Sequence, residues 1–378
     1  MIFGARPVRR LVRVGSVPVG GGAPVSVQSM TKTDTRDVAA TVAQIHQLTE
    51  AGCDIVRLAV PDLAAARALG AIKAEITLPL VADIHFNHRL ALEAIRQGVD
   101  KIRLNPGNLR KPEYVSEVAR RAGEAGVAIR VGVNAGSLPP ESRARYEAEH
   151  GPAEATARAM LDAAKEQIAL LEAEGFHDIV VSAKAFDVPA TVRAYQLIAA
   201  ACDYPLHIGI TEAGLPPAGT VRSAVGLGLL LAGGLGDTLR VSLPTDPVEE
   251  VRVGRAILGA LNLRRRGLTL VVCPTCGRCE VDLRGLAERA EQRLADLDRR
   301  LHEQGREITV AIMGCVVNGP GEAREAHVGV AAGKGRGVIF SHGHPLRTVE
   351  EGQVLDTLVE EIEKVVREGS APAPPTTS

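Results

Sequence analysis

The sequence predicts an α/β protein: an amino-terminal (β/α)8 TIM barrel followed by a smaller α+β domain. Eight short apolar runs alternate with helical patterns over roughly 240 residues, which is the usual length of such a barrel. The remaining part carries a CxxC pair and a third cysteine in a glycine-rich loop. A chain of 378 residues is also too long for one ordinary core. We expect a barrel domain over 1–263, a linker over 264–267, a second domain over 268–368 and a disordered tail over 369–378.

The eight apolar runs define the barrel strands. They are Val25–Met30, Asp54–Val60, Leu80–Phe86, Lys101–Asn105, Ala128–Asn134, Asp178–Lys184, Leu206–Thr211 and Thr238–Leu243. Helical patterns separate them, and the last helix begins at Asp246-Pro247, an N-cap followed by proline at the first helical position. A doubly wound open sheet is the competing architecture, but no GxGxxG motif follows the first run.

Before the barrel, Leu11–Val25 alternates apolar and small residues around Gly20-Gly21-Gly22, which predicts a hairpin. After the barrel, patterns predict a helix over 283–302, strands over 308–313 and 338–341, and a final amphipathic helix over 348–367.

Composition excludes several classes of function. A formal net charge of −1 and 2% aromatic residues argue against nucleic acid as a partner. No apolar run approaches the roughly 20 residues of a membrane span. Six cysteines at irregular spacing in a long chain indicate a reducing compartment, and we expect a cytoplasmic protein.

The predicted strands carry polar residues where an apolar run should be unbroken. Barrel strands are covered on both faces, so these side chains must face the barrel interior or its mouth. Five cations on five strands predict a basic ring that binds a small polyanion, most simply a diphosphate. The candidate binding residues are Arg57, Asp83, His85, Arg103, Asn105, Arg130, Asn134, Ser182, Lys184, Thr211, Arg240 and Ser242, with Glu212 beside them. The long loop over 135–152 could act as a lid.

The cysteine stretch predicts a metal centre. Cys273 and Cys276 have the two-residue spacing with which two thiolates reach one metal, and Cys315 and Glu322 lie in a loop rich in glycine. Three thiolates and a carboxylate suit an iron–sulfur cluster with one exchangeable corner. A structural zinc site with Cys279 as the fourth thiolate is the alternative, and spacing alone does not decide between them.

Several long strings together identify a resemblance. VQSMTKTDTRD, IVRLAV, VADIHF, KIRLNPGN, RVGVNAGSL, HIGITEAG, CPTCGR and MGCVVNGPGEA occur in this order. With them the chain closely resembles the IspG/GcpE family of bacterial 4-hydroxy-3-methylbut-2-en-1-yl diphosphate synthases, over essentially its whole length. Cys279 stands where that family usually has another residue.

The resemblance implies reductive ring opening and dehydroxylation of 2-C-methyl-D-erythritol 2,4-cyclodiphosphate, in the methylerythritol phosphate route to isoprenoids. It implies one [4Fe-4S] cluster per chain, held by Cys273, Cys276, Cys315 and Glu322, and reduced flavodoxin or ferredoxin as electron donor. It places diphosphate binding on Arg57, His85, Arg103, Arg130, Lys184, Arg240 and Ser242, and the catalytic acid on Glu212.

Two rival functions fit parts of the pattern. Lys184 on the sixth strand suits the Schiff base of a class I aldolase-type lyase, with the cysteines holding structural zinc. A zinc-ribbon binding protein fused to a degenerate barrel is a third interpretation, which the polar mouth disfavours.

Chain geometry predicts a head-to-tail homodimer. The eighth helix leaves the barrel at the face opposite the mouth, and linker 264–267 spans at most about 14 Å. The cluster of one chain is then expected to serve its partner's mouth.

Overall fold

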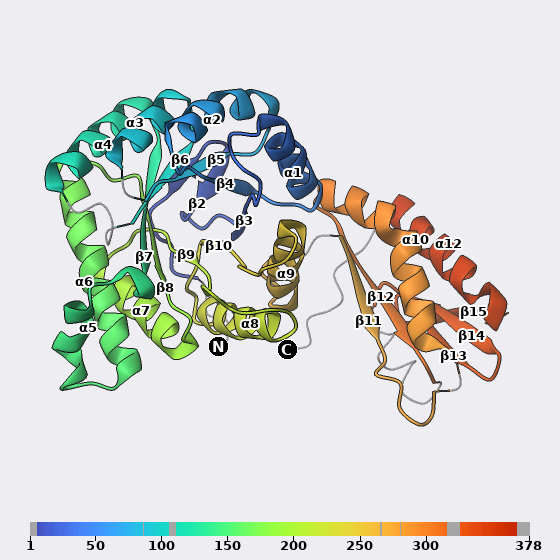
Figure 1. The fold of residues 1–378 in the computed structure, drawn as a ribbon. Helices are drawn as coiled ribbons and strands as arrows, with labels where there is room; N and C mark the ends of the chain where they lie inside the picture. Colours follow the sequence, from blue (N-terminus) through green and yellow to red (C-terminus); the bar gives the residue numbers. More distant parts are fainter. Residues whose placement is uncertain are drawn as a thin grey trace. The chain divides into compact units, whose positions relative to one another are not determined.

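The computed structural model describes residues 6–85, 87–105, 111–264, 267–279, 281–315 and 326–368. Contacts divide the chain into two compact units, Met1–Arg264 and Arg265–Ser378, each with its own hydrophobic core (Figure 1). The predicted ligand Glu322 and the predicted tail 369–378 lie outside the described residues.

In the described part of the first unit, eight parallel strands form the predicted barrel, which is confirmed. Their order is β8-β7-β6-β5-β4-β3-β10-β9, and an isolated bridge between Val181 and Leu206 joins the two end strands. The bounds are β3 (Ser26–Met30), β4 (Ile55–Ala59), β5 (Leu80–Asp83), β6 (Lys101–Leu104), β7 (Ala128–Asn134), β8 (Ile179–Lys184), β9 (His207–Ile208) and β10 (Thr238–Leu239).

The last two barrel strands are shorter than predicted. Each spans two residues, instead of Leu206–Thr211 and Thr238–Leu243. The Arg240 amide donates to the Ile208 carbonyl at 3.0 Å. Gly209, which follows, offers no side chain to pack, and glycine weakens a strand. The backbone beyond it turns to form the wall of the mouth.

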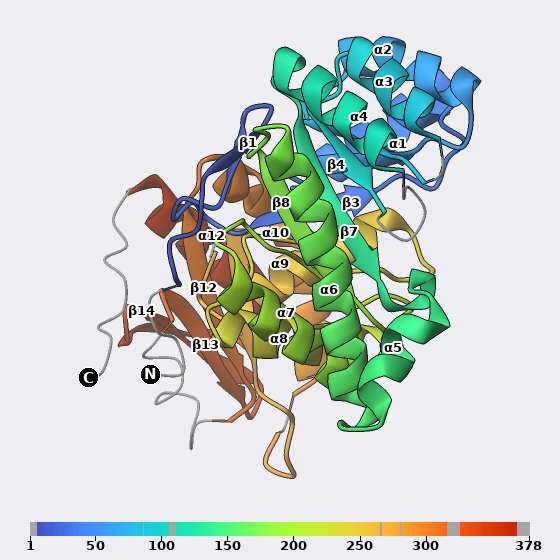
Figure 2. The same cartoon turned by 90° about the vertical axis from the view of Figure 1, so that its left-hand side faces the viewer.

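Helices surround the barrel, and Figure 2 shows α6 lying over β7 and β8. Their bounds are α1 (Val38–Glu50), α2 (Leu63–Glu75), α3 (His88–Arg96), α4 (Pro112–Ala125), α6 (Pro152–Ala173), α7 (Val188–Ala201), α8 (Ala218–Ala232) and α9 (Pro247–Ala260). Aspartates begin four of these described helices by accepting a hydrogen bond from a first-turn amide: Asp37, Asp62, Asp187 and Asp246. Each such cap stabilises its helix by about 1 kcal/mol.

The amino-terminal hairpin closes the barrel at the end where its strands begin. Strands β1 (Val12–Val14) and β2 (Val17–Val19) pair antiparallel. Their valines pack against inward-facing residues near the starts of the barrel strands, such as Ile55 and Val81. The turn lies at Gly15-Ser16 and not at Gly20-Gly21-Gly22 as predicted, because Gly15 takes the left-handed conformation that a tight turn requires (φ 55°).

The predicted loop 135–152 is largely helical. It contains a 3-10 turn, η1 (Ala135–Ser137), and a short helix, α5 (Pro140–Glu147). Tyr146 donates a hydrogen bond of 2.5 Å to Asp162 on α6. The segment is therefore docked on the barrel's outer helix instead of forming an open loop.

The second unit is a sheet covered by two helices. Within its described residues the sheet has the order β11-β12-β13-β14-β15. The bounds are β11 (Gly267–Val272), β12 (Glu307–Met313), β13 (Val328–Gly333), β14 (Arg336–Ser341) and β15 (His344–Glu350), with helices α10 (Leu283–Glu303) and α12 (Val354–Arg367). Apolar residues of both helices share one core with β12, β13 and β14.

The start of the last helix was predicted wrongly. The helix begins at Val354 and not at Thr348, because 344–350 pairs with β14 as an edge strand. Among the described residues no helix is long and apolar enough to cross a membrane.

Candidate functional site

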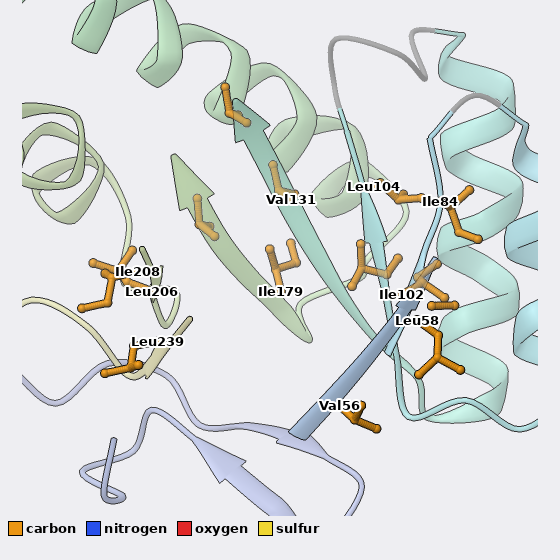
Figure 3. Close-up of a cluster of buried hydrophobic side chains, with 14 of the residues drawn as sticks. Val56, Leu58, Ile84, Ile102, Leu104, Val131, Ile179, Leu206, Ile208 and Leu239 are labelled. Carbon is orange, nitrogen blue, oxygen red and sulfur yellow. The ribbon is translucent and has the colours of Figure 1, made fainter. Parts of the chain in front are cut away.

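Barrel strands alternate between side chains that pack under the helices and side chains that point into the barrel. Leu58 and Ile102 are fully buried in the core under the helices (Figure 3). Their sequence neighbours Arg57 and Arg103 therefore point inward. The same alternation turns each predicted polar residue toward the barrel axis or its mouth.

Strand pairing places these residues at similar heights along the barrel axis. Asp83 pairs with Arg103, and Arg103 with Arg130. Nearer the mouth, Asn134 pairs with Lys184. Of the predicted residues, Asp83, Arg103, Asn105, Arg130, Ser182 and Lys184 are buried, Arg57, Asn134, Thr211, Arg240 and Ser242 are half-buried, and His85 and Glu212 are exposed.

Asp83 contacts two of the predicted cations and the predicted binding residue His85. Its carboxylate oxygens lie 3.3 Å from Arg103 Nη1, 3.2 Å from His85 Nε2 and 3.8 Å from Arg57 Nε. Burial alone would raise the pKa of Asp83, but Arg57, His85 and Arg103 together hold it well below its usual range. Asp83 is therefore ionised and orients the cations that surround it.

Arg130 lies deeper in the barrel and carries uncompensated charge. Arg130 is 2% exposed, and among the described residues its Nε and Nη1 atoms have no hydrogen-bond partner. Burial lowers its pKa, and repulsion from Arg57 and Arg103 adds to this effect. A guanidinium nevertheless stays protonated at neutral pH. The interior therefore favours a ligand that brings negative charge.

A second polar layer lies inside the barrel, and sequence reasoning missed it. Lys101 and His207 are fully buried, and in the described residues neither the Lys101 ammonium nor either ring nitrogen of His207 has a partner. Burial, then repulsion from Arg130, lowers the pKa of Lys101 well below its ordinary value. Lys101 begins its strand, where sequence patterns predict a solvated side chain.

We expect Lys101→Met to stabilise the barrel by about 1–4 kcal/mol at pH 7, because it removes an unpaired buried amine. The folded-state pKa lies below the unfolded value of about 10.4, so folding releases a proton at any pH between the two values. That cost falls as pH rises toward the unfolded pKa. Between pH 7 and 9.5, the free energy of unfolding should therefore rise more for the wild type than for Lys101→Met.

Urea unfolding, monitored by hydrogen exchange of the barrel strands, measures how the free energy of unfolding of each protein changes with pH. Lys165→Met is the matched control, because Lys165 is exposed on α6 and should change neither stability nor pH dependence. Equal pH slopes for wild type and Lys101→Met would contradict the prediction.

A cavity of about 620 Å³ opens at the barrel mouth beside Arg240. Its lining includes Lys32, Glu212, Arg240, Ser242 and Glu250. Glu212 adopts a left-handed backbone conformation (φ 55°), which is uncommon for a residue with a side chain and concentrates at functional sites. The cavity thus combines cations, a hydroxyl and carboxylates on one wall.

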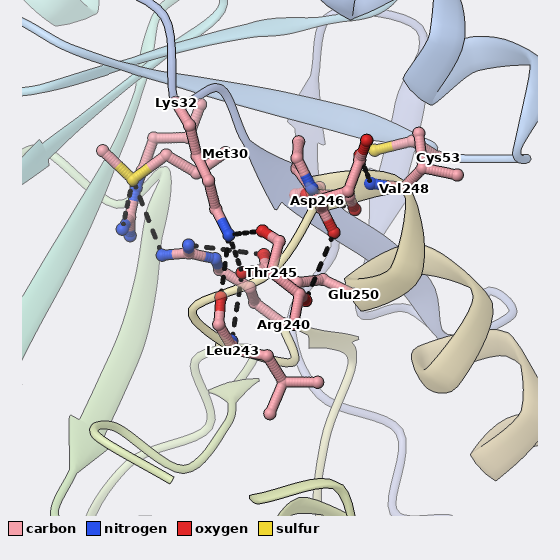
Figure 4. A network of polar contacts seen from close by, with 12 residues as sticks. Met30, Lys32, Cys53, Arg240, Leu243, Thr245, Asp246, Val248 and Glu250 are labelled. Atoms are coloured by element: carbon pink, nitrogen blue, oxygen red, sulfur yellow. Dashed lines mark hydrogen bonds and ion pairs between the residues drawn. The ribbon is translucent and has the colours of Figure 1, made fainter. Parts of the chain in front are cut away.

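Glu250 on α9 organises this wall and was also missed from the sequence (Figure 4). Its carboxylate accepts from the Leu243 amide at 3.0 Å and lies 3.4 Å from Arg240 and 3.3 Å from Lys32. Lys32 also donates to the carbonyls of Leu243 and Thr245. Burial lowers the pKa of Arg240 to about 10, so the group stays charged.

Two glycines make room for the ring. A Cβ atom at Gly132 would lie 2.5 Å from Arg103 Nε. A Cβ atom at Gly209 would lie 2.5 Å from both Lys184 Nζ and the Arg240 carbonyl oxygen. Each glycine lies two residues from a candidate polar residue, Gly132 from Arg130 and Gly209 from Thr211, but nothing in the sequence shows which side chains cross them.

In the second unit the cysteines gather at one edge of the sheet. β11 and β12 are parallel, with Val272 beside Ile312, and the Cys273 amide donates to the Ile312 carbonyl at 3.1 Å. Cys273 and Cys315 therefore follow the carboxyl ends of neighbouring strands. The turn that contains Cys276 and Cys279 folds back, since a Cβ atom at Gly314 would lie 2.6 Å from Cys279 Sγ.

The chemistry of these donors suits a thiolate-bound iron–sulfur cluster, although among the described residues no three His, Cys, Asp or Glu side chains are already arranged around a metal position. Cys273 is half-buried between two apolar clusters, and Cys276 is exposed. Thiolates at a partly covered sheet edge suit iron. Glu322 lies outside the described residues, so its place in the ligand set stays a prediction.

Comparison with protein families decides the relationship. The GcpE TIM-barrel domain model matches residues 9–255, and the GcpE protein C-terminal domain model matches residues 269–364. The chain belongs to the GcpE family. Both halves of the GcpE architecture are thus present in this chain.

GcpE relatives share about half of its residues. A protein of Geobacter sulfurreducens is 56% identical over 95% of this chain and 98% of its own length. One of Thermodesulfovibrio yellowstonii is 52% identical over 94% and 98%. One of Caldanaerobacter subterraneus is 49% identical over 96% and 99%. Each is named 4-hydroxy-3-methylbut-2-en-1-yl diphosphate synthase (flavodoxin).

Membership in the GcpE family disfavours the rival interpretations. The aldolase-type lyase depended on Lys184 as an amine nucleophile, whereas the relatives are diphosphate synthases. Lys184 is buried among cations, where burial and then repulsion from Arg130 and Arg57 lower its pKa. Such a lysine could serve as a nucleophile, so the family match and not the pKa disfavours the lyase.

Proposed function

We propose that this chain reduces 2-C-methyl-D-erythritol 2,4-cyclodiphosphate to 4-hydroxy-3-methylbut-2-enyl diphosphate with electrons from reduced flavodoxin. The supporting observation is the uncompensated positive charge of Arg130 inside the barrel, close to Arg57 and Arg103. A cyclic diphosphate carries two negative charges and little apolar surface, so guanidinium groups suit its binding. The names of the relatives supply the diphosphate product and the donor.

The barrel residues bind and orient the substrate. Arg57 and Arg103, held by Asp83, and Arg240, held by Glu250, offer N–H groups to phosphoryl oxygens. Arg130 supplies positive charge from deeper in the barrel, close to the Lys184 amine. Ser242 and Asn134 offer hydrogen bonds at the mouth, which fix the sugar-derived carbons in one orientation.

Glu212 is the proposed proton donor. The reaction takes up two electrons and two protons, and one substrate oxygen leaves as water. Glu212 lines the cavity, but it is exposed in this unit. The burial that favours a protonated carboxyl must therefore come from whatever covers the mouth.

We propose one [4Fe-4S] cluster per chain, held by Cys273, Cys276, Cys315 and Glu322. When bound, such a cluster passes electrons singly to the substrate. We place the protein in the cytoplasm, because an exposed thiol such as Cys276 stays reduced there.

Two measurements test this function. Anaerobically purified protein should be brown, with broad absorption near about 400 nm, and should form the product from the cyclodiphosphate with reduced flavodoxin. Arg103→Met should raise the substrate's dissociation constant by roughly tenfold or more and leave iron content unchanged. A colourless, zinc-containing protein without turnover would contradict the proposal.

We further propose a head-to-tail homodimer in which each mouth is served by the other chain's cluster. Arg264 donates to Asp54 at 2.8 Å and to the Val25 carbonyl at 3.4 Å, and these residues precede β4 and β3. The chain therefore leaves the barrel at the amino-terminal end of its strands, opposite the mouth. β11 begins at Gly267. This short connection favours a site shared between two chains.

Mixing two inactive variants tests the dimer. Glu212→Gln chains lack the acid, and Cys315→Ser chains lack the cluster. After subunit exchange, the mixture should regain about a quarter of wild-type activity, since half the dimers are mixed and each of these has one of its two sites intact. Exchange is verified with affinity tags. An inactive mixture with proven exchange would show that each chain serves its own mouth.

A further inference from the structure

Met30, at the carboxyl end of β3, contacts two arginines of the ring (Figure 4). Its sulfur accepts from Arg57 Nε at 3.1 Å and Arg57 Nη2 at 2.9 Å. Arg240 Nη1 lies 3.5 Å from the same sulfur. One thioether therefore lies between two guanidinium groups that repel each other.

The sulfur differs from the acidic partners of these arginines. Arg57 lies 3.8 Å from Asp83, which is farther than its contacts with Met30. Arg240 lies 3.4 Å from Glu250, about as far as from the sulfur. A carboxylate would cancel much of the positive charge, whereas a thioether is a neutral, weak acceptor. It therefore orients the guanidinium groups without neutralising them.

We propose that Met30 is a positioning residue of the anion site: its sulfur holds Arg57 and Arg240 in place and leaves their charge for phosphoryl oxygens. The inference rests on the proposed function, because it assumes that the ring binds a diphosphate. A weak sulfur contact also lets the two arginines adjust when an anion arrives.

Simple packing is the competing explanation, because methionine fills irregular gaps in cores. Two substitutions separate these roles. Met30→Leu keeps an apolar side chain of similar volume but loses the acceptor. Met30→Gln keeps an acceptor atom near the sulfur position. Packing predicts that leucine is the milder change, and positioning predicts that glutamine is.

We expect Met30→Leu to weaken binding of inorganic pyrophosphate by roughly tenfold, the order of one lost charge-assisted arrangement. KM for the cyclodiphosphate should rise by a similar factor while kcat stays within about twofold, since the acid and the cluster are untouched. Met30→Gln should restore the pyrophosphate affinity to within about threefold of wild type. Isothermal titration calorimetry measures the affinities.

Met160→Leu is the matched control. Met160 is fully buried in the core under α6, so it reports the general effect of losing a methionine. Wild-type affinity in Met30→Leu, or a larger loss in Met30→Gln than in Met30→Leu, would overturn the inference. In either case an active wild type would leave the proposed function standing. A wild type that binds no pyrophosphate and shows no turnover would remove both.

Discussion

Glu322→Ala is expected to assemble an iron–sulfur cluster on its three cysteines and yet lose most of its turnover. Thiolates bind iron strongly, whereas a carboxylate is the weaker ligand and the one that a substrate can replace. Loss of the Glu322 carboxylate should leave cluster assembly intact and change only the iron position that this ligand is proposed to occupy. Iron and sulfide content per chain, with the absorption near about 400 nm, measures assembly separately from activity.

Cys315→Ser is the matched variant in the same loop. Cys315 follows β12 at the sheet edge that also carries Cys273, so its loss should remove the cluster itself. Equal cluster loss in the two variants would show that Glu322 is needed for assembly, and the assignment of an exchangeable ligand would be wrong.

Gly209→Ala should damage both the stability of the barrel and its anion binding. The new methyl carbon would lie 2.5 Å from the Arg240 carbonyl oxygen, which belongs to the backbone of the next strand and cannot easily move. Overpacking of this kind costs about 1–3 kcal/mol. The same methyl would displace Lys184 Nζ, so pyrophosphate affinity should fall as well.

Gly132→Ala isolates the second effect. There the methyl meets only the Arg103 side chain, which can shift. We expect weaker pyrophosphate binding with a smaller loss in the free energy of unfolding, measured by urea titration. Wild-type stability in Gly209→Ala would mean that the strand can move aside, and the packing argument would fail.

The barrel was predictable because its strands repeat one pattern in order. β7 was predicted with its correct bounds, since apolar residues flank Arg130 without interruption. β9 and β10 were predicted too long, because Gly209 and the wall of the mouth look like strand in sequence. In the second unit, β13 was missed because its glycine and alanine residues carry little strand signal.

Residues that act through a distant partner were not predictable. Glu250 is one of two adjacent glutamates on α9, and only the fold brings it to Lys32 and Arg240. Met30 looked like an ordinary strand residue until two arginines were found at its sulfur. Sequence patterns indicate which way a side chain points, but not what meets it there.

The carboxylates on the cavity wall bear on which anions the barrel admits. Buried guanidinium groups attract phosphate, nucleotides and other cellular polyanions alike, so attraction alone does not discriminate. Glu212 and Glu250 line the same cavity as Arg240 and Ser242. A compact ring can lie beside Arg240 and Ser242 without reaching Glu212, whereas a longer polyphosphate would place a further phosphate against the carboxyl group that the reaction needs. Selectivity among metabolites would then come from the carboxyl groups at the rim.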